Sequence, residues 1–430
     1  MYFTESEKQL PILYDVDVLV VGAGPAGIGA AMRAARLGCK TMLVEAQGAL
    51  GGISTVGMMS HWGGRSSSKI YQEIQQRSAA LHENIGDAKY HNVKTHIIDP
   101  EQLKCLLSRM MQEARVQILL YTLACGAVVE NGRITGVIIQ NKTGRSVIRA
   151  KAVVDASGDG DVAAYAGVPF CLGRESDHKM QPCTLMFKVA GVDYQRAVFP
   201  ASFETTVPTD KGELQALAKK LLPFPAGHVL LYKSTLPGVV TCNMTNCINI
   251  DGTTAEGLTA GTMACQSQLE PIVRFLREYV PGYEHCYLIS SASLLGIRET
   301  RHFKGLQTLT EQDILQPHFD RDWVVREAYF NFDVHNLTGP SLDKTGLQHG
   351  FTQTESYCIP YGCLLPQKVD GLLLSGRNIS GSHLAHSNFR IMTVCMAIGE
   401  ASGVAAALSA LSGRSPRDIF PTQIQKIVSE

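Results

Sequence analysis

The first 52 residues hold the feature that most constrains the fold: an apolar strand, a glycine-rich turn, a helix and a second strand that ends in an acid. Residues 16–22 are almost all apolar or glycine, which is typical of a strand covered on both faces. Gly22 permits a tight turn, Gly24 lets the backbone approach a pyrophosphate, and Gly27 lets the helix pack closely on the strand. This order of elements predicts a dinucleotide-binding unit.

Glu45 extends this prediction to the ribose of the ligand. It ends the second strand, 21 residues after Gly24. A carboxylate at this place accepts hydrogen bonds from ribose hydroxyls and repels a 2′-phosphate. We expect further cofactor contacts from the start of the helix and from the loop after the acid, namely Pro25, Ala26, Ala46, Gly51 and Gly52.

Composition bounds the partners of the chain. With 430 residues and 45% hydrophobic content, the chain is long enough for two domains with a large core. Its 39 Lys and Arg balance its 39 Asp and Glu, so no net charge attracts nucleic acid or an anionic membrane. The 12 cysteines lack CxxC spacing, and no signal or long apolar segment precedes the first strand. We therefore expect a cytoplasmic protein with reduced thiols and no metal.

Three later segments organise the rest of the chain. Residues 151–161 form a buried strand followed by a turn, residues 166–355 differ in character and carry no dinucleotide pattern, and residues 371–375 form another apolar strand. A helix is predicted over 255–279, and a long helix of small residues from about Arg390 to Ser412. Hairpin turns are predicted at Asn131-Gly132 and Thr143-Gly144.

Together these segments resemble a known class of flavoproteins. The glycine-rich opening, Glu45 and the Gly51-Gly52 pair resemble the N-terminal signature of the glutathione-reductase-type FAD proteins, and residues 151–161 resemble their Ala-Thr-Gly motif, with Ser157 in place of Thr. With three more stretches the chain looks like the FAD-dependent oxidoreductase family related to the heterodisulfide reductase A subunit: Leu295-Gly-Ile-Arg298-Glu299-Thr-Arg301, Tyr357-Cys-Ile-Pro-Tyr-Gly and Ile379 to Gly403.

The resemblance implies an α/β fold: a Rossmann-like FAD-binding domain, 1–165 and 356–430, with an inserted α+β substrate domain, 166–355. It implies FAD as cofactor, held also by Ser157, Gly158 and Asp159, by Gly376, Arg377 and Asn378, and by Arg390 and Ile391 at the start of the long helix. Arg377 stands where the family carries an acid that binds the ribityl chain. The iron–sulfur ligands of the A subunit have no counterpart in this sequence.

Histidines and arginines near the expected flavin are the catalytic candidates. His383 and His386 precede the long helix, and His61 follows the Gly51-Gly52 loop, so each is placed to move a proton. The alternative for each is a buried histidine bonded to backbone. Arg298 and Arg301 are placed either to clamp a carboxylate or sugar hydroxyl, or to pair with acids at the domain junction.

We expect hydride transfer between FAD and a carbon of a small polar substrate, and favour a CH–OH donor such as a sugar, polyol or hydroxy acid. One histidine would take the hydroxyl proton, and a separate electron acceptor, which the sequence does not identify, would reoxidise the flavin. A C=C reductase of the fumarate-reductase-like branch and an electron-relay subunit are the alternatives. A homo-oligomer remains open.

Overall fold

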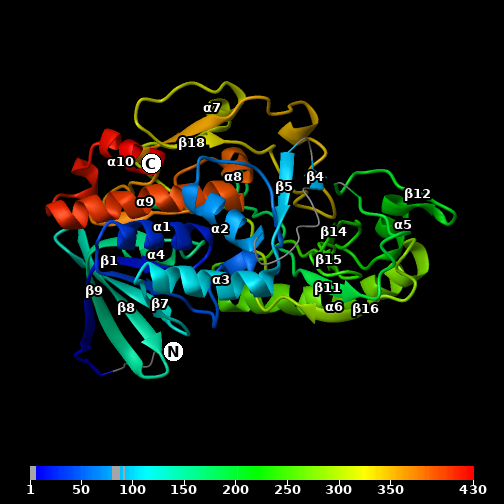
Figure 1. Cartoon of the computed structure of the whole chain (residues 1–430), viewed down its shortest axis with the longest axis horizontal. Helices are drawn as coiled ribbons and strands as arrows, with labels where there is room; N and C mark the ends of the chain where they lie inside the picture. Colours follow the sequence, from blue (N-terminus) through cyan, green and yellow to red (C-terminus); the bar gives the residue numbers. More distant parts are fainter. Residues whose placement is uncertain (1–5, 80–87, 91–92, 201) are drawn as a thin grey trace.

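A mixed sheet lies at the centre of the larger of two bodies in the computed structural model, which describes residues 6–79, 88–90, 93–200 and 202–430 (Figure 1). In the described residues this sheet has seven strands in the order β6-β2-β1-β9-β8-β7, and β20 also pairs with β9. The strands are β1 (Ile12–Val21), β2 (Thr41–Val44), β6 (Gln117–Leu119), β7 (Leu123–Glu130), β8 (Arg133–Asn141), β9 (Gly144–Asp155) and β20 (Leu372–Leu374).

Strand β9 joins the two ends of the chain. It runs parallel to β1 along most of its length, pairs antiparallel with β8 through its first residues, and pairs parallel with β20 through Val153, Val154 and Asp155. The last part of the chain therefore returns to the same sheet as the first. The predicted hairpin turns separate β7 from β8 and β8 from β9, and Asn131 and Gly132 both have positive φ, as a two-residue hairpin turn requires.

Helices α1 (Pro25–Arg36) and α9 (Met392–Ser412) pack against each other over this sheet, below β18 and α10 (Figure 1). Their backbones approach closely because glycines face the contact. A Cβ on Gly399 would lie 2.0 Å from the carbonyl oxygen of Ala26, and one on Gly403 would lie 2.2 Å from that of Ala30. Helix α9 is long and apolar enough to cross a membrane, but 89% of its apolar window is buried inside the structure, as expected of a core helix.

The remaining elements of the larger body surround this core. Helix α3 starts after Asp99, whose side chain caps it by accepting hydrogen bonds from the amides of Glu101 and Gln102. The elements are α2 (Lys69–Ala79), α3 (Pro100–Glu113), α4 (Asp161–Tyr165), α7 (Glu311–Leu315), α8 (His383–Phe389), α10 (Pro421–Ser429), β3 (His61–Trp62), β4 (Ala88–Tyr90) and β5 (Val93–Ile97). Short 3-10 turns cover Gly52–Ser54, Leu347–His349, Tyr361–Cys363 and Pro416–Asp418.

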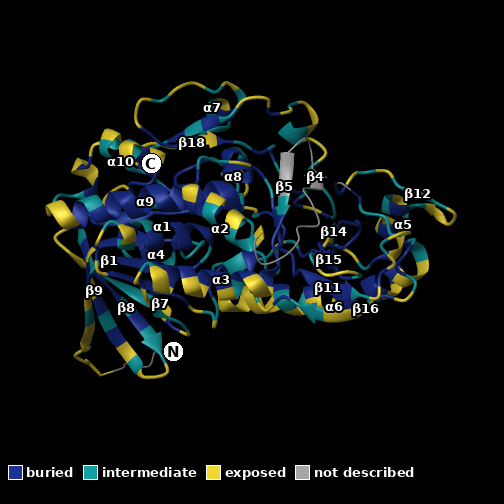
Figure 2. Cartoon of the chain, in the orientation of Figure 1, coloured by how far each residue is buried: buried dark blue, intermediate teal, exposed yellow. Residues whose placement is uncertain are grey.

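The smaller body is an antiparallel sheet covered by helices, with a hydrophobic core of its own drawn from residues 187–286. Figure 2 shows buried residues at the centre of both bodies and exposed residues along their outer helices and loops. Helix α6 has the predicted bounds. The elements are β11 (Phe187–Ala190), β12 (Pro208–Thr209), β13 (Gly212–Glu213), α5 (Leu214–Leu221), β14 (Leu231–Lys233), β15 (Val240–Cys242), α6 (Ala255–Tyr279) and β16 (Tyr287–Ser291).

The chain returns to the larger body well before residue 355. Phe303, Val324 and Phe332 belong to the larger core, although the sequence analysis assigned them to the insertion. Strand β10 (Phe170–Leu172) pairs with β17 (Arg301–Phe303), and β18 (Trp323–Ala328) pairs with β19 (Tyr357–Pro360) beside α9. The exact domain boundaries stay a prediction, but the separate core is smaller than the predicted insertion.

Candidate active site

A cavity of about 670 Å³ opens where the carboxyl ends of four parallel strands meet the smaller body. This is where α/β sheets bind ligands, and the volume lies in the range of cofactor and substrate pockets. Of the predicted cofactor-binding residues, fourteen border the cavity: Gly22, Gly24, Pro25, Ala26, Glu45, Ala46, Gly52, Ser157, Gly158, Asp159, Gly376, Arg377, Arg390 and Ile391. Gly27, Gly51 and Asn378 do not.

The glycine-rich turn leaves an opening for an anion. Gly22 has φ +94°, and a Cβ on it would lie 2.4 Å from the carbonyl oxygen of Ala156. A Cβ on Gly27 would lie 1.8 Å from the carbonyl oxygen of Gly22, so Gly27 allows helix and turn to pack. A Cβ on Gly24 would meet nothing within 4 Å. Helix α1 has no side-chain cap at Gly24, and its first amides are therefore available to a pyrophosphate.

Glu45 borders the cavity and also holds the turn. Its Oε2 accepts a hydrogen bond from the amide of Ala23 at 2.6 Å, and its Oε1 accepts one from the amide of Gln47 at 2.8 Å. Burial raises the pKa of Glu45, while these amides lower it. Gly51 supports the same turn, since its amide donates to the carbonyl of Ala23 at 2.7 Å. The carboxylate is thus fixed beside the glycine-rich turn, where a ribose is expected.

Arg377 is neutralised by an acid from another strand. Its Nη2 lies 2.9 Å from Oδ1 of Asp159, which also accepts a hydrogen bond from Thr300. The family's acid is therefore absent at position 377, but a carboxylate lies beside it. Asn378 caps its own turn: its Nδ2 donates to the carbonyl of Asp155, and its Oδ1 accepts from the amide of Ser375, each at 2.9 Å.

A charged cluster borders the cavity where the insertion contributes to the wall. Arg390 Nη2 lies 2.6 Å from Asp333 Oδ2, and His335 Nε2 lies 3.2 Å from the same oxygen. Arg298 also borders the cavity, and its Nη1 donates to the carbonyl of Pro182 at 2.5 Å. Lys233 is exposed at the same wall. Arg390 is paired with Asp333, whereas Arg298 and Lys233 add positive charge to the same wall, which favours an anionic ligand.

Aromatic and apolar side chains form the rest of this wall. The rings of His61 and Tyr232 are stacked with centroids 4.1 Å apart, and Asn243 Nδ2 donates to the Tyr232 hydroxyl at 3.5 Å. Ser60 Oγ lies 3.2 Å from His61 Nδ1. The apolar members include Met59, Met186, Phe199, Phe203, Leu231, Leu294 and Leu295. The wall therefore suits a substrate with an apolar body.

Burial sets the protonation of the cavity groups at neutral pH. It lowers the pKa of His61 to about 3 and that of His335 to about 4, where Arg298 lowers it further and Asp333 opposes the shift. It raises the pKa of Tyr232 to about 12. Burial would also raise the pKa of Asp333, but His335, Arg390 and Arg298 hold it well below its usual range. The site thus presents two neutral imidazoles, a protonated phenol and a carboxylate.

Three predicted catalytic residues do not border the cavity. Arg301 Nη1 pairs with Asp161 Oδ1 at 2.8 Å and donates to the carbonyl of Asp159, so it ties the domain junction. His383 and His386 are buried at the start of α8, and His383 Nδ1 lies 2.6 Å from Glu299. The placement of these three corrects the expectation that they face the substrate. Their positions next to the long helix were right, but short helix α8 turns them inward.

Sequence reasoning missed Asp333, His335 and Tyr232. A usable signal was present for the first two. They lie two residues apart in an extended segment, and residues at that spacing project to the same side of the chain. Tyr232 carried no such signal, because only the packing of β14 brings it beside His61.

Comparisons with known proteins identify the family of the chain. The model of the FAD-dependent oxidoreductase family matches residues 17–428. A digeranylgeranylglycerophospholipid reductase of Thermoplasma acidophilum is 24% identical over a match that covers 46% of this chain. One of Methanopyrus kandleri is 28% identical over a match that covers 44% of this chain. The matches cover 54% and 51% of those relatives, about half their length.

A solved structure has a similar fold. A geranylgeranyl bacteriochlorophyll reductase-like protein of Thermoplasma acidophilum superposes with a TM-score of 0.50 over 96% of this chain and 82% of its own, at 16% identity. The more specific kinship with the heterodisulfide reductase A subunit stays a prediction. The family match spans nearly the whole chain, and the open helix terminus, the cradle at Gly24 and the carboxylate of Glu45 fit FAD. The chain therefore belongs to the FAD-dependent oxidoreductase family, and its cavity fits FAD.

Proposed function

We propose that this oxidoreductase oxidises the CH–OH group of a hydroxy acid that has an apolar side chain. The observation that carries the proposal is the cluster of Arg298, Asp333 and His335 in an otherwise largely apolar wall. A sugar or polyol would leave this wall in contact with hydroxyl groups that find few partners, and burying unpartnered polar groups is costly. Of the three classes of CH–OH donor expected from the sequence, namely sugars, polyols and hydroxy acids, the wall therefore favours hydroxy acids.

Arg298 is the proposed carboxylate ligand. Its Nη1 is occupied by the carbonyl of Pro182, and within the described residues it has no carboxylate at ion-pair distance, unlike Arg390, which is paired with Asp333. Its guanidinium remains charged although burial lowers its pKa. A planar guanidinium binds a carboxylate through two parallel hydrogen bonds, which also orients the neighbouring carbon.

His335 is the proposed base. Nε2 faces Asp333, so a neutral ring donates its proton there and leaves Nδ1 with the lone pair that accepts a hydroxyl proton. Asp333 fixes this tautomer and stabilises the ring once it becomes charged. A bound FAD would supply the acceptor for the hydride that the substrate carbon loses. Met59, Phe203 and the stacked pair of His61 and Tyr232 exclude water from this end of the cavity.

Anaerobic flavin bleaching tests the proposal. A 2-hydroxy acid with an alkyl side chain should bleach the bound flavin, while its methyl ester and a sugar alcohol should be far slower. Arg298→Gln should weaken substrate binding about tenfold to 100-fold, because a charge-assisted pair is lost. His335→Gln should slow bleaching about 10²–10⁴-fold with little change in binding. The exposed Arg274→Gln serves as the control and should match the native chain.

Two outcomes of the bleaching experiment would contradict this proposal. If dithionite bleaches the flavin but no hydroxy acid does, the dehydrogenase proposal is wrong. Bleaching that is equally fast in His335→Gln would remove His335 from the reaction.

A C=C reductase is the second candidate, and Tyr232 favours it. Its hydroxyl stays protonated at neutral pH and belongs to the cavity wall, so it is able to protonate a carbon next to a carboxylate held by Arg298. Two of the relatives are named as reductases. This function predicts that an enoate reoxidises photoreduced flavin anaerobically and that Tyr232→Phe slows the step. An electron-relay protein predicts no response to either substrate class.

A further inference from the structure

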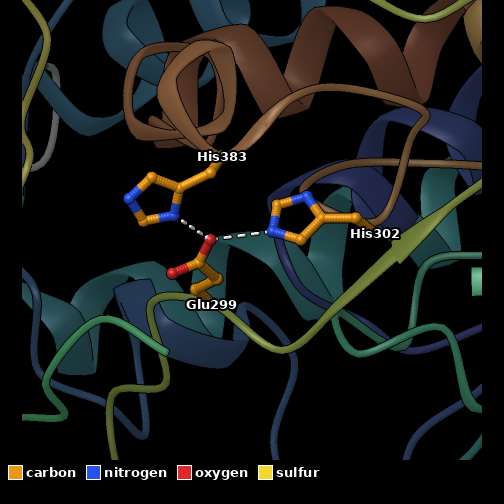
Figure 3. A group of neighbouring side chains, drawn as sticks. All are labelled: Glu299, His302 and His383. Carbon is orange, nitrogen blue, oxygen red and sulfur yellow. Dashed lines mark hydrogen bonds and ion pairs between the residues drawn. The ribbon is translucent and has the colours of Figure 1, made fainter. Parts of the chain in front are cut away.

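Three buried side chains converge behind the wall that carries Arg298. Oε1 of Glu299 lies 2.8 Å from Nε2 of His302 and 2.6 Å from Nδ1 of His383 (Figure 3). Glu299 is fully buried, and the two imidazoles are less than one-tenth exposed. His383 comes from the start of α8, whereas Glu299 lies just before β17 and His302 lies within that strand.

His302 and Glu299 also make hydrogen bonds to residues outside the cluster, in the pattern that metal ligands usually show. Nδ1 of His302 lies 3.1 Å from the carbonyl oxygen of Gly381, and Oε2 of Glu299 accepts a hydrogen bond from the amide of Gln181 at 2.9 Å. A metal-bound histidine usually donates its second N–H to a carbonyl, and a metal-bound carboxylate is itself hydrogen-bonded. Two of the three candidate ligands, His302 and Glu299, are therefore oriented by a partner outside the cluster.

Proton accounting at His302 supports the same conclusion. A neutral imidazole carries one N–H, and the carbonyl of Gly381 places it on Nδ1. The lone pair of Nε2 then faces the carboxylate oxygen of Glu299, although both are acceptors. Two acceptors 2.8 Å apart in a buried site repel each other unless a cation or a further proton lies between them.

We propose that Glu299, His302 and His383 bind a divalent transition metal ion, with Zn²⁺ as the best match to two imidazoles and one carboxylate. A tetrahedral Zn²⁺ holds its ligand atoms about 3.3 Å apart, so the side chains separate by roughly 0.5–0.7 Å on binding. His386 lies nearby, with its ring centroid 5.0 Å from that of His302, and its Nδ1 is buried without a hydrogen-bond partner in the described chain. His386 is not among the side chains whose ligand atoms all lie within 4.8 Å of one another, so a fourth ligand from it would require its side chain to move.

The metal would be structural. It would link the segment that carries Arg298 to the start of α8 and so hold the arginine against the cavity. None of the three ligands borders the cavity. The site does not depend on the proposed substrate, and a failure of one proposal leaves the other untouched.

Metal analysis of the full-length chain tests the site. The chain should be purified without a histidine tag, loaded with Zn²⁺, dialysed and measured by mass spectrometry. We expect about one Zn²⁺ per chain and at least about a tenfold loss of bound metal in His302→Gln and His383→Gln, because each removes a ligand. His228→Gln is the matched control. It replaces a buried histidine outside the cluster that bonds the carbonyl of Asn243, and it should retain the metal.

X-ray absorption at the zinc edge of the native chain covers the case in which the ligand variants fail to fold. Scattering from two or three imidazoles and an oxygen is expected. A spectrum without imidazole scattering would overturn the proposal. So would native chain that holds no stoichiometric metal after separate loading with Zn²⁺, Mn²⁺ or Fe²⁺, since the cluster would then be a protonated imidazole paired with Glu299.

Discussion

At the scale of single residues, the cavity contains charges whose partners are mostly fixed. Asp159 neutralises Arg377, and Asp333 neutralises Arg390. Glu45 and Arg298 differ, since among the described residues Glu45 is held by backbone amides and Arg298 by a carbonyl, and neither has an ion-pair partner there. These two residues therefore retain the charge with which to recognise a ligand, Glu45 beside the glycine-rich turn and Arg298 beside the apolar wall.

Glu45→Gln should weaken FAD binding without removing the shape of the side chain. Replacing a charged acceptor of the ribose hydroxyls costs about 1.5–3 kcal/mol, which is about tenfold to 150-fold in Kd. Titration of the apoprotein with FAD, followed by flavin fluorescence, measures the change. Glu45→Arg, which adds bulk and the opposite charge, should abolish the bound flavin. The exposed Glu130→Gln is the control, and equal affinity in Glu45→Gln would refute the ribose contact.

At the scale of elements, the crossing of α1 and α9 decides where the cofactor cavity lies. Ala26 borders the cavity, and its carbonyl lies against Gly399 of α9. The close approach lets a helix from the end of the chain support the first turn of the helix from its start. A larger side chain at this crossing has no room, because the obstructing atoms belong to the backbone.

Gly399→Ala should destabilise the chain by about 1–3 kcal/mol or more through overpacking. It should also weaken FAD binding, since α1 is displaced together with Ala26. Thermal unfolding of the apoprotein and the FAD-bound chain measures both effects. Ser412→Ala, at the exposed end of the same helix, should change the free energy of unfolding by less than about 0.5 kcal/mol. A Gly399→Ala chain as stable as the native one would show that the two helices are not in close contact.

At the scale of the whole molecule, the junction of the two bodies buries several histidines in neutral form. Burial lowers the pKa of His61 and His228 to about 3 and that of His335 to about 4. Asp155, the last residue of β9, acts in the opposite direction. Burial raises its pKa to about 6, so the folded chain binds its proton more tightly than the unfolded chain does. The balance of these groups makes the stability of the molecule depend on pH.

The free energy of unfolding should fall as the pH drops from about 6.5 to about 4. In this window the unfolded chain holds a proton on each of the three histidines that the folded chain lacks, while folded Asp155 holds one that the unfolded chain lacks. These four groups give a net uptake of about two protons on unfolding, and buried His386, whose pKa is also lowered, adds to it, so the slope should be at least roughly 2.7 kcal/mol per pH unit near pH 5. Denaturant unfolding at a series of pH values measures the slope.

Two histidine variants test whether the buried histidines cause the loss of stability at low pH. His228→Gln removes one of the three histidines and should reduce the slope by about 1.4 kcal/mol per pH unit. The exposed His318→Gln should leave the slope unchanged. An unchanged slope in His228→Gln would mean that buried histidines do not set the acid sensitivity.

Local pattern was enough to predict the cofactor half of the site. Strand, turn and helix are specified by neighbours in the chain, and the glycines at 22, 24 and 27 act within a few residues of one another. The return of β20 to the sheet followed from its apolar run and from the family resemblance. The three residues predicted to bind cofactor that lie off the cavity, Gly27, Gly51 and Asn378, are adjacent to residues that border it and support the turns that carry them.

What the sequence determined by itself is therefore the FAD-binding unit, because its interactions are short in range and repeat a periodic pattern. Only the tertiary structure decided the substrate wall and the buried cluster. Arg390 meets Asp333 across 57 residues of chain, and His383 meets Glu299 across 84. Such contacts depend on how the insertion folds and docks, since a buried charge finds its partner by packing and not by its place in the chain.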